Sequence, residues 1–372
     1  AVTDHPVDGA RTLEATDSLF EGSVLHPAGC PVCEQVHLVD DDLLETPCLA
    51  CAEGTLEPQP AKVSPEPPEL YVPFGLTPAE LRPKLKSFIR PVWFKTRELH
   101  VNTLMSRLTR VWVPMWLVDA LVVGKWEGEV GYNYEVKSSQ EHFKAGKWTT
   151  EELIETRIRW EPRVGQICRE VHNVAVRALD GHDQLETTVG IYDLRQAVPF
   201  ERPVLVESSI RVADLRPQAA WMDAVSMIKS RVASYCRDAV GSDHMGEFFL
   251  QVEHQNLNWT WLLLPLYVTW YTDSSGKRRI ITISGQTGKM NGARMASVKK
   301  GLVWASIILL LATTIGVVGL LSALLAIAFP PIVIVSLIIL AFSFVFGCFA
   351  IWPVVRPWRW NKQENTSWLV KR

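Results

Sequence analysis

Basic residues are almost missing from the start of this 372-residue chain. Residues 1–70 contain 14 acids and two bases, whereas the remaining residues carry 36 bases against 26 acids. Affinity for nucleic-acid phosphates depends on lysine and arginine, so the first part is a poor nucleic-acid surface. An acidic front and a basic remainder indicate that the two parts face different partners.

Catalytic signatures are missing too. The sequence contains no serine nucleophile elbow, no His-Glu-x-x-His motif and no Cys–His pair with a local signature, and its nine histidines are scattered. The stretch "ISGQTGKMNG" resembles a phosphate loop, but that loop requires glycine where Ile283 stands and serine or threonine where Met290 stands. We therefore predict no enzyme and a tight turn between Gly285 and Gly288, with an enzyme acting on lipid or peptide near a membrane as the alternative.

Charged residues are absent from Gly301 to Val355, a run of 55 residues. One bilayer crossing needs about 20 apolar residues, so the run fits two helices. Pro330 and Pro331 break it near the middle, which predicts helices over 302–328 and 332–353. We expect a transmembrane hairpin over 299–357 in place of a buried core hairpin, because neither helix has a polar stripe.

The flanks of this run predict its orientation. Lys299 and Lys300 precede it, and three bases follow it at Arg356, Arg359 and Lys362. Positive charge at both ends predicts that both termini are cytoplasmic, in the inner (cytoplasmic) membrane, with 358–372 as a cytoplasmic tail. Small residues would let another helix approach the first one closely, or they are ordinary membrane-helix usage: Ala312, Gly316, Gly319 and Ala323.

Four of the seven cysteines form two Cys-x-x-Cys pairs. Cys30 and Cys33 stand in "CPVC", Cys48 and Cys51 stand in "CLAC", and 14 residues separate the pairs. Four thiolates at this spacing close a tetrahedron around one structural metal ion. The prediction is a zinc ribbon over 26–56, with iron or a redox dithiol as alternatives, and His37 as a competing ligand.

The surroundings of the predicted ribbon favour protein docking over DNA binding or a purely structural role, because acids crowd it. A disordered acidic arm is expected over 1–25, where no secretory signal is visible. Residues 57–70 contain five prolines, which predicts a semi-rigid spacer that holds the ribbon away from the next domain.

Residues 71–298 predict one cytoplasmic α+β domain, rich in strands with a few helices. Thr77 and Glu80 form a capping-box pattern that starts one helix, and a second is expected over about 95–108. The best helix covers "PQAAWMDAVSMIKSRVASYCRDAV" and ends at Gly241. Its predicted apolar face consists of Trp221, Val225, Ile228, Val232 and Tyr235.

Seven bases and no acid lie between Ser274 and Lys300, directly before the apolar run. A juxtamembrane basic cluster attracts anionic lipid headgroups, although a topology signal needs only the last two bases. The predicted headgroup residues are Lys277, Arg278, Arg279, Lys289, Arg294, Lys299 and Lys300.

Taken in order along the chain, these motifs resemble a known group. The two cysteine pairs, "YVPF", "RPVWF", "VWVPMWLVDA" and "ISGQTGKMNG" before C-terminal membrane helices are similar to bacterial TFIIB-type zinc-ribbon membrane proteins. That group is often labelled primosomal protein N′ (replication factor Y) helicase-like, although no helicase motor motif is present here. The resemblance implies a membrane anchor or recruiter for band-7/SPFH-type or phage-shock partners, with only the four cysteines carried over as metal ligands.

Three functions follow as hypotheses. The first is a non-enzymatic membrane scaffold whose zinc ribbon docks other membrane-associated proteins. The second is an accessory subunit of a large respiratory, photosynthetic or transport complex. The third is a nucleic-acid-binding zinc-ribbon protein, which the acidic surroundings disfavour.

Overall fold

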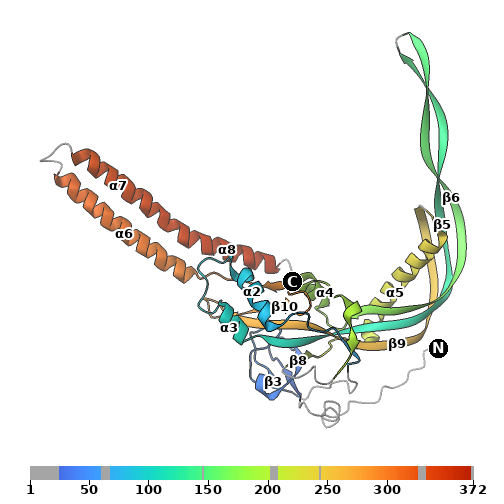
Figure 1. The fold of residues 1–372 in the computed structure, drawn as a ribbon, viewed down its shortest axis with the longest axis horizontal. Coiled ribbons are helices and arrows are strands. Elements are labelled where there is room, and N and C mark those ends of the chain that lie inside the picture. Colours follow the sequence, from blue (N-terminus) through green and yellow to red (C-terminus); the bar gives the residue numbers. More distant parts are fainter. Residues whose placement is uncertain are drawn as a thin grey trace. The chain divides into compact units, whose positions relative to one another are not determined.

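The computed structural model describes six stretches of the chain: 25–59, 68–144, 146–201, 208–242, 244–325 and 332–369. The predicted acidic arm up to residue 24, most of the spacer and the Pro330-Pro331 turn lie outside them. The chain divides into two compact units (Figure 1). The first comprises residues 1–114, 181–212 and 263–372, and the second comprises 115–180 and 213–262. The predicted domain over 71–298 contributes to both units.

The first unit is built on a sheet whose strand order is β11-β10-β9-β5-β8-β2-β1-β3. Two long strands, β5 (Thr109–Lys144) and β9 (His244–Thr272), enter this sheet by one end only, and β4 pairs with β7 beside it. The short strands are β1 (His26–Gly29), β2 (Val36–Val39), β3 (Glu57–Pro58), β4 (Leu70–Tyr71), β7 (Val198–Pro199), β8 (Ser208–Arg211), β10 (Arg278–Ser284) and β11 (Met290–Gly292).

The cysteine-bearing segment is part of this sheet, so the prediction that a spacer holds it away was wrong. β2 pairs antiparallel with β8, and β8 pairs parallel with β5. Leu38 and Ile210 stand opposite each other and are fully buried. The pairing satisfies the open edge of β2 and supplies an apolar neighbour that the short polar segment lacks.

Helices close the core of this unit. α2 (Pro78–Ile89) begins at the predicted capping box, with the Thr77 and Glu80 side chains each bonded to the other's backbone. Its buried face packs against Tyr267 and Tyr271 of β9. α3 (Val101–Ser106) is shorter than the predicted 95–108, because Lys95 forms a β-bridge with Ala296. The described part of the unit also contains the short helices η1 (Asp41–Leu43), α4 (His182–Val189) and η2 (Leu194–Gln196).

The "ISGQTGKMNG" stretch is a turn between β10 and β11, as predicted. Gly288 has a φ of +73°, and its N–H donates to the carbonyl of Ser284. Gly285 donates to the Pro265 carbonyl, and a Cβ there would lie 2.6 Å from Phe74. The turn therefore joins neighbouring segments of the unit.

The second unit contains an antiparallel hairpin of β5 and β6 (Lys147–Arg177), with α5 (Pro217–Val240) packed on it. The strand predictions for this region are confirmed, and α5 ends at Gly241 as predicted. Its most buried stripe differs from the predicted one, because small residues let the helix lie close to the sheet, while Trp221 and Tyr235 flank the contact. That stripe is Ala220, Ala224, Ile228, Val232 and Cys236.

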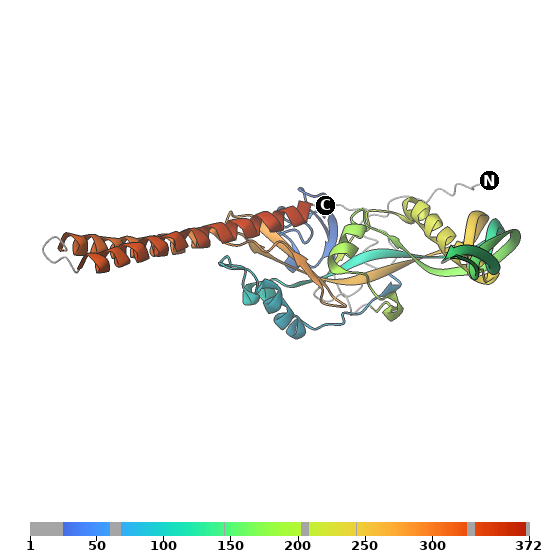
Figure 2. The ribbon, with the colours of Figure 1, turned by 90° about the horizontal axis from the view of Figure 1, so that it is seen from above.

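Two apolar helices end the chain. α6 (Val298–Leu325) and α7 (Ile332–Cys348) are paired side by side (Figure 2). Both are long and apolar enough to cross a membrane once α7 is taken with its continuation. The second apolar helix was predicted to end at residue 353, but the helical chain continues beyond it: η4 (Phe349–Ile351) leads into α8 (Trp352–Leu369). Pro353 is tolerated in the first turn of α8, because a backbone N–H there has no helical partner.

The predicted small-residue face lies in this pair. Ser343 Oγ donates to the Ala312 carbonyl at 2.7 Å, and a Cβ at Gly319 would lie 3.0 Å from Ile339. A Cβ at Gly301 would overlap the Pro353 carbonyl. The small residues therefore serve the close approach of α6 to its own neighbours α7 and α8.

Candidate metal centre

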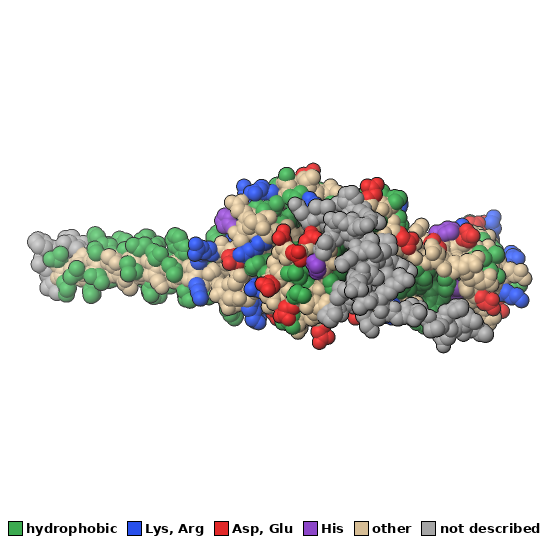
Figure 3. All heavy atoms as spheres, turned by 90° about the horizontal axis from the view of Figure 1, so that it is seen from below, with side chains coloured by type: hydrophobic (Ala, Val, Ile, Leu, Met, Phe, Trp, Pro, Cys, Tyr) green, Lys and Arg blue, Asp and Glu red, His purple; other side chains and the backbone are tan. Residues whose placement is uncertain are grey.

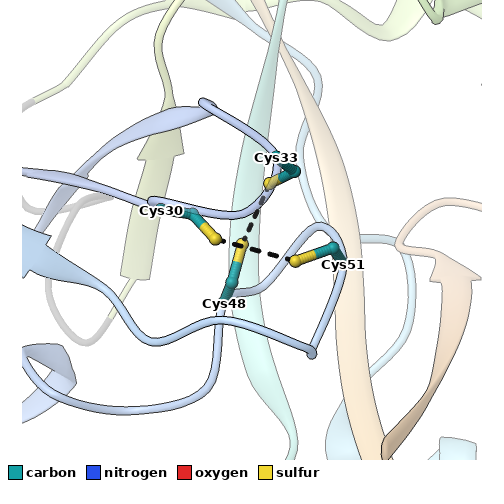
Figure 4. A group of neighbouring side chains, drawn as sticks. All are labelled: Cys30, Cys33, Cys48 and Cys51. Carbon is teal, nitrogen blue, oxygen red and sulfur yellow. Dashed lines mark hydrogen bonds between the residues drawn. The ribbon is translucent and has the colours of Figure 1, made fainter.

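The four predicted cysteines meet at one point (Figure 4). Cys30 Sγ lies 3.7 Å from Cys51 Sγ, Cys33 Sγ lies 3.6 Å from Cys48 Sγ, and all four sulfurs lie within 4.8 Å of one another. A tetrahedron of sulfurs at about 2.3 Å from zinc has edges of about 3.8 Å. The cluster is therefore compatible with a metal ion such as zinc, and four thiolates leave no coordination position for a substrate.

The two cysteine pairs share one backbone design. The carbonyl of Cys30 accepts from the N–H of Glu34, and the carbonyl of Cys48 accepts from the N–H of Ala52. Glu34 and Ala52 have φ values of +58° and +57°, which are rare for residues other than glycine. Each chain reversal aims both sulfurs of its pair inward.

Gly54 completes the wall of the cluster. Its carbonyl accepts from the N–H of Cys48 at 2.9 Å, and a Cβ built on it would lie 2.5 Å from Cys30 Sγ. Only glycine leaves room for the sulfur there. Sequence reasoning missed this residue, although its place three positions after the last cysteine could have drawn attention to it.

The metal-free thiols have unequal acidities. Burial raises the pKa of Cys33, and burial raises the pKa of Cys48 to about 11. Burial acts to raise the pKa of Cys30 as well, but backbone hydrogen bonds from Cys33 and Val32 outweigh it, so that pKa is lowered. A bound cation would favour all four thiolates, and binding would release protons.

His37 is not in the cluster, although it lies between the cysteine pairs in the sequence. It is 2% exposed on β2, and its Nδ1 lies 3.2 Å from Ser209 Oγ on β8. Burial, assisted by the positive charge of Arg211, lowers the pKa of His37 to about 3. His37 is therefore a neutral residue of the β2–β8 contact.

Acidification should weaken the fold through His37. Its pKa is about 3 when folded and about 6.5 when unfolded, so only the unfolded chain binds the proton between these values. The contribution of neutral His37 to the free energy of unfolding is fully present well above pH 6.5 and is lost as the pH falls. Between pH 7.5 and 5.5 the loss is about 1.4 kcal/mol.

The measurement is the free energy of unfolding of the metal-loaded chain in detergent at both pH values. His37→Gln should lose about 1.4 kcal/mol less than the parent, since glutamine does not titrate. The matched control, His100→Gln, changes an exposed histidine and should behave as the parent. Equal losses in the parent and His37→Gln would contradict this role.

The structure separates the seven bases that were predicted to face lipid headgroups. Lys277 and Lys289 lie at opposite ends of β10, which spans about 20 Å at 3.3 Å per residue. Arg279 is held by Asp273 at 2.9 Å, and Arg294 is held by Glu364 at 2.8 Å. Arg278 lies over the Trp270 ring, whereas Lys299 and Lys300 are exposed at the start of α6.

One arginine and two tryptophans form a cluster at the base of the apolar helices. The sequence had pointed to Arg356 only as one of the bases that follow the apolar run. Arg356 of α8 lies 4.0 Å from the ring centre of Trp93 and 4.7 Å from that of Trp352. The two rings are edge to face at 5.0 Å, and both are about half exposed. Trp93 stands more than 200 residues away in the sequence, so no local pattern joins it to α8.

Comparisons with known proteins found no match: no family model, no curated protein and no solved structure matches the chain. The resemblance to zinc-ribbon membrane proteins therefore stays a prediction.

Proposed function

We propose that this protein is a non-enzymatic scaffold, anchored in the cytoplasmic membrane with both termini in the cytoplasm, that docks other membrane-associated proteins through its zinc ribbon. The observation that carries the proposal is the firm connection between the apolar helices and the β-sheet unit. A scaffold needs such a connection to present a surface at a set place beside the bilayer. The resemblance stated above supports partners of the band-7/SPFH kind.

Four side-chain contacts make that connection at α8. Glu364 accepts from Arg294, and Trp360 Nε1 donates to the Arg294 carbonyl at 2.6 Å. Asn361 accepts from the Ala296 N–H and donates to the Ala296 carbonyl. The helix that leaves the apolar pair is thereby hydrogen-bonded to the segment that enters it.

The metal centre supports a docking role in two ways. A four-thiolate site is closed to substrate, so it stabilises a surface and does no chemistry. That surface carries exposed carboxylates at Asp42, Glu53 and Glu57. Such a surface suits a basic or polar protein partner and opposes nucleic acid.

A pull-down from mild detergent tests the docking role. Reversing the charge of Asp42, Glu53 and Glu57 to lysine should remove co-purifying proteins and leave the metal bound, because none of the three is a ligand. The matched control reverses three exposed acids of the second unit, Glu127, Glu247 and Glu253. Unchanged recovery from the ribbon variant contradicts docking, and salt-dependent capture of DNA would favour the nucleic-acid alternative.

The anchor also supports binding of anionic lipid. Lysine and arginine side chains gather where the hydrophobic helices meet the body of the unit (Figure 3). Lys299, Lys300, Arg356 and Arg359 are exposed there, beside the half-exposed Trp93. Interfacial tryptophan and basic residues are typical of the headgroup layer. These residues support the start of α6 and α8, in place of the two ends of β10, as the surface that binds anionic lipid.

Charge reversal should separate these two locations. Lys300→Glu with Arg356→Glu should reduce retained phosphatidylglycerol, since each base contributes about 1 kcal/mol near an anionic surface. Lys277→Glu with Lys289→Glu makes the same change of charge near the two ends of β10 and should leave the amount of bound phosphatidylglycerol unchanged. Lipid bound to the detergent-purified chain is counted by mass spectrometry. Equal losses of bound lipid in both variants would contradict this location and would favour all seven predicted bases as the lipid-binding surface.

A further inference from the structure

The outer half of the β5–β6 hairpin is a bare two-stranded ribbon (Figure 1). β9 begins beside Asn133, where His244 Nε2 lies 2.8 Å from Asn133 Oδ1. The hairpin continues past this point from the pair Tyr134–Arg157 to the pair Lys144–Lys147. Within the described part of the chain, β6 pairs with no strand except β5. An isolated two-stranded ribbon is only marginally stable in water, so pairing with a further strand would stabilise this one.

One face of β6 leaves apolar side chains in solvent. Ile154, Ile158 and Trp160 are 57%, 40% and 46% exposed, and alternate residues of a strand share a face. At the tip, Phe143 and Trp148 form a cross-strand pair that is also exposed. Exposed apolar residues in a row beside an open strand edge are a binding surface or an aggregation hazard.

The other face of β6 carries charges in an ordered sequence. Glu155 lies toward the tip and bonds Arg157 at 3.0 Å, and Glu161 bonds Arg159 and Arg163 closer to the base. Residues 148–156 contain three glutamates and no base, whereas 157–163 contain three arginines and one glutamate. The strand is therefore acidic toward the tip and basic toward the base.

We propose that the outer edge of β6 binds the same edge of a second copy of this chain, antiparallel, with the two-fold axis at Thr156. Antiparallel pairing reverses one strand against the other, so the acidic half of each copy faces the basic half of its neighbour. In this register Glu155 stands opposite Arg157 of the second copy. Ile154 stands opposite Ile158 of the second copy on the other face, and each contact occurs twice.

The second copy is favoured over an unrelated strand because one register brings Glu155 to Arg157 on one face and Ile154 to Ile158 on the other. Thr156 meets its own counterpart, which brings two neutral, β-branched residues together at the axis. The open N–H and C=O groups of the two edges supply main-chain hydrogen bonds, as in other strand-addition complexes. A parallel arrangement in register would place Glu155 opposite Glu155 and Arg157 opposite Arg157, which is destabilising.

Disulfide trapping tests the axis directly. Thr156→Cys, in a full-length chain whose exposed Cys168 and Cys348 are changed to serine, should cross-link to a dimer on mild oxidation in detergent. Opposed residues of an antiparallel pair lie about 4.5–5.5 Å apart, within disulfide reach. The matched control is Ser139→Cys, which is exposed on β5 of the same ribbon. Cross-linking no greater than the control, or cross-linking to a chain of different mass, overturns the proposal.

Charge exchange tests the register. Glu155→Arg or Arg157→Glu alone places like charges opposite each other twice and should weaken self-association by about tenfold. The double variant Glu155→Arg/Arg157→Glu restores opposite charges and should restore the dimer, as followed by sedimentation in detergent. A double variant as weak as the single ones contradicts this register.

A shortened hairpin tests whether the dimer contact lies elsewhere. Replacing residues 135–156 by an Asn-Gly turn removes the bare ribbon and keeps the part beside β9. The shortened chain should be monomeric with its metal still bound. A dimer that persists would place the contact on another surface and overturn the proposal.

Discussion

Loss of one metal ligand should release the metal and unfold the segment between β1 and β3. In Cys48→Ser the fourth thiolate is replaced by a hydroxyl, which is a poor ligand for zinc at neutral pH. Metal binding contributes about 10–16 kcal/mol to folding in zinc-finger peptides, so the ribbon should not persist without it. The metal content found by elemental analysis should fall from one ion per chain to nearly none, and limited proteolysis should newly cut within 31–57.

The matched control is Cys168→Ser, which changes an exposed cysteine of β6 far from the cluster in sequence. It should retain the metal and the parent cleavage pattern. Elemental analysis of the parent also decides between zinc and iron. Retention of the metal by Cys48→Ser, or a metal-free parent that resists proteolysis within 31–57, would contradict a structural metal site.

Loss of the Glu364 carboxylate should detach α8 from the sheet unit. The Glu364 side chain is 12% exposed and the Arg294 side chain 25%, so the pair is largely buried. Breaking such a pair costs about 3–5 kcal/mol, because the remaining charge is left without compensation. Glu364→Ala should lower the free energy of unfolding by about 3 kcal/mol, the lower end of this range. The reason is that Arg294 still donates to the Phe88 carbonyl at 3.2 Å.

Trypsin provides the readout, because Arg356, Arg359 and Lys362 all lie in α8. Cleavage there should accelerate in Glu364→Ala and accelerate less in Glu364→Gln, which keeps a hydrogen-bond acceptor for Arg294 but removes the charge. The double variant Arg294→Ala/Glu364→Ala should be less destabilised than the sum of the single ones, since no charge remains unpaired. Additive losses would show that the two side chains act independently.

Local pattern was enough for the features that depend on neighbours in the sequence. The capping box at Thr77, the turn at Gly285–Gly288, α5 and the two apolar helices follow from residue spacing, glycine conformation and hydropathy. The four cysteines were also found by spacing, since two Cys-x-x-Cys pairs can reach one centre.

Contacts between distant segments were beyond that reasoning. Nothing in residues 26–56 shows that β2 pairs with β8, because an open strand edge can be satisfied by any strand of suitable register. The charge of Arg294 looks the same in the sequence whether it faces lipid or Glu364, 70 residues away. Trp93 joins Arg356 only once the loop after α2 reaches the base of α6.

The sequence by itself determined that the chain has a four-cysteine cluster, an apolar helix pair and long strands, because each is a matter of composition and spacing. Only the tertiary structure decided which surfaces those elements leave open. It joins the cysteine-bearing strands to one end of the sheet, assigns two of the seven predicted lipid-facing bases to ion pairs, and leaves the outer half of the β5–β6 hairpin bare. The physical reason is that burial and pairing depend on which distant segments the fold brings to a charge or a strand edge.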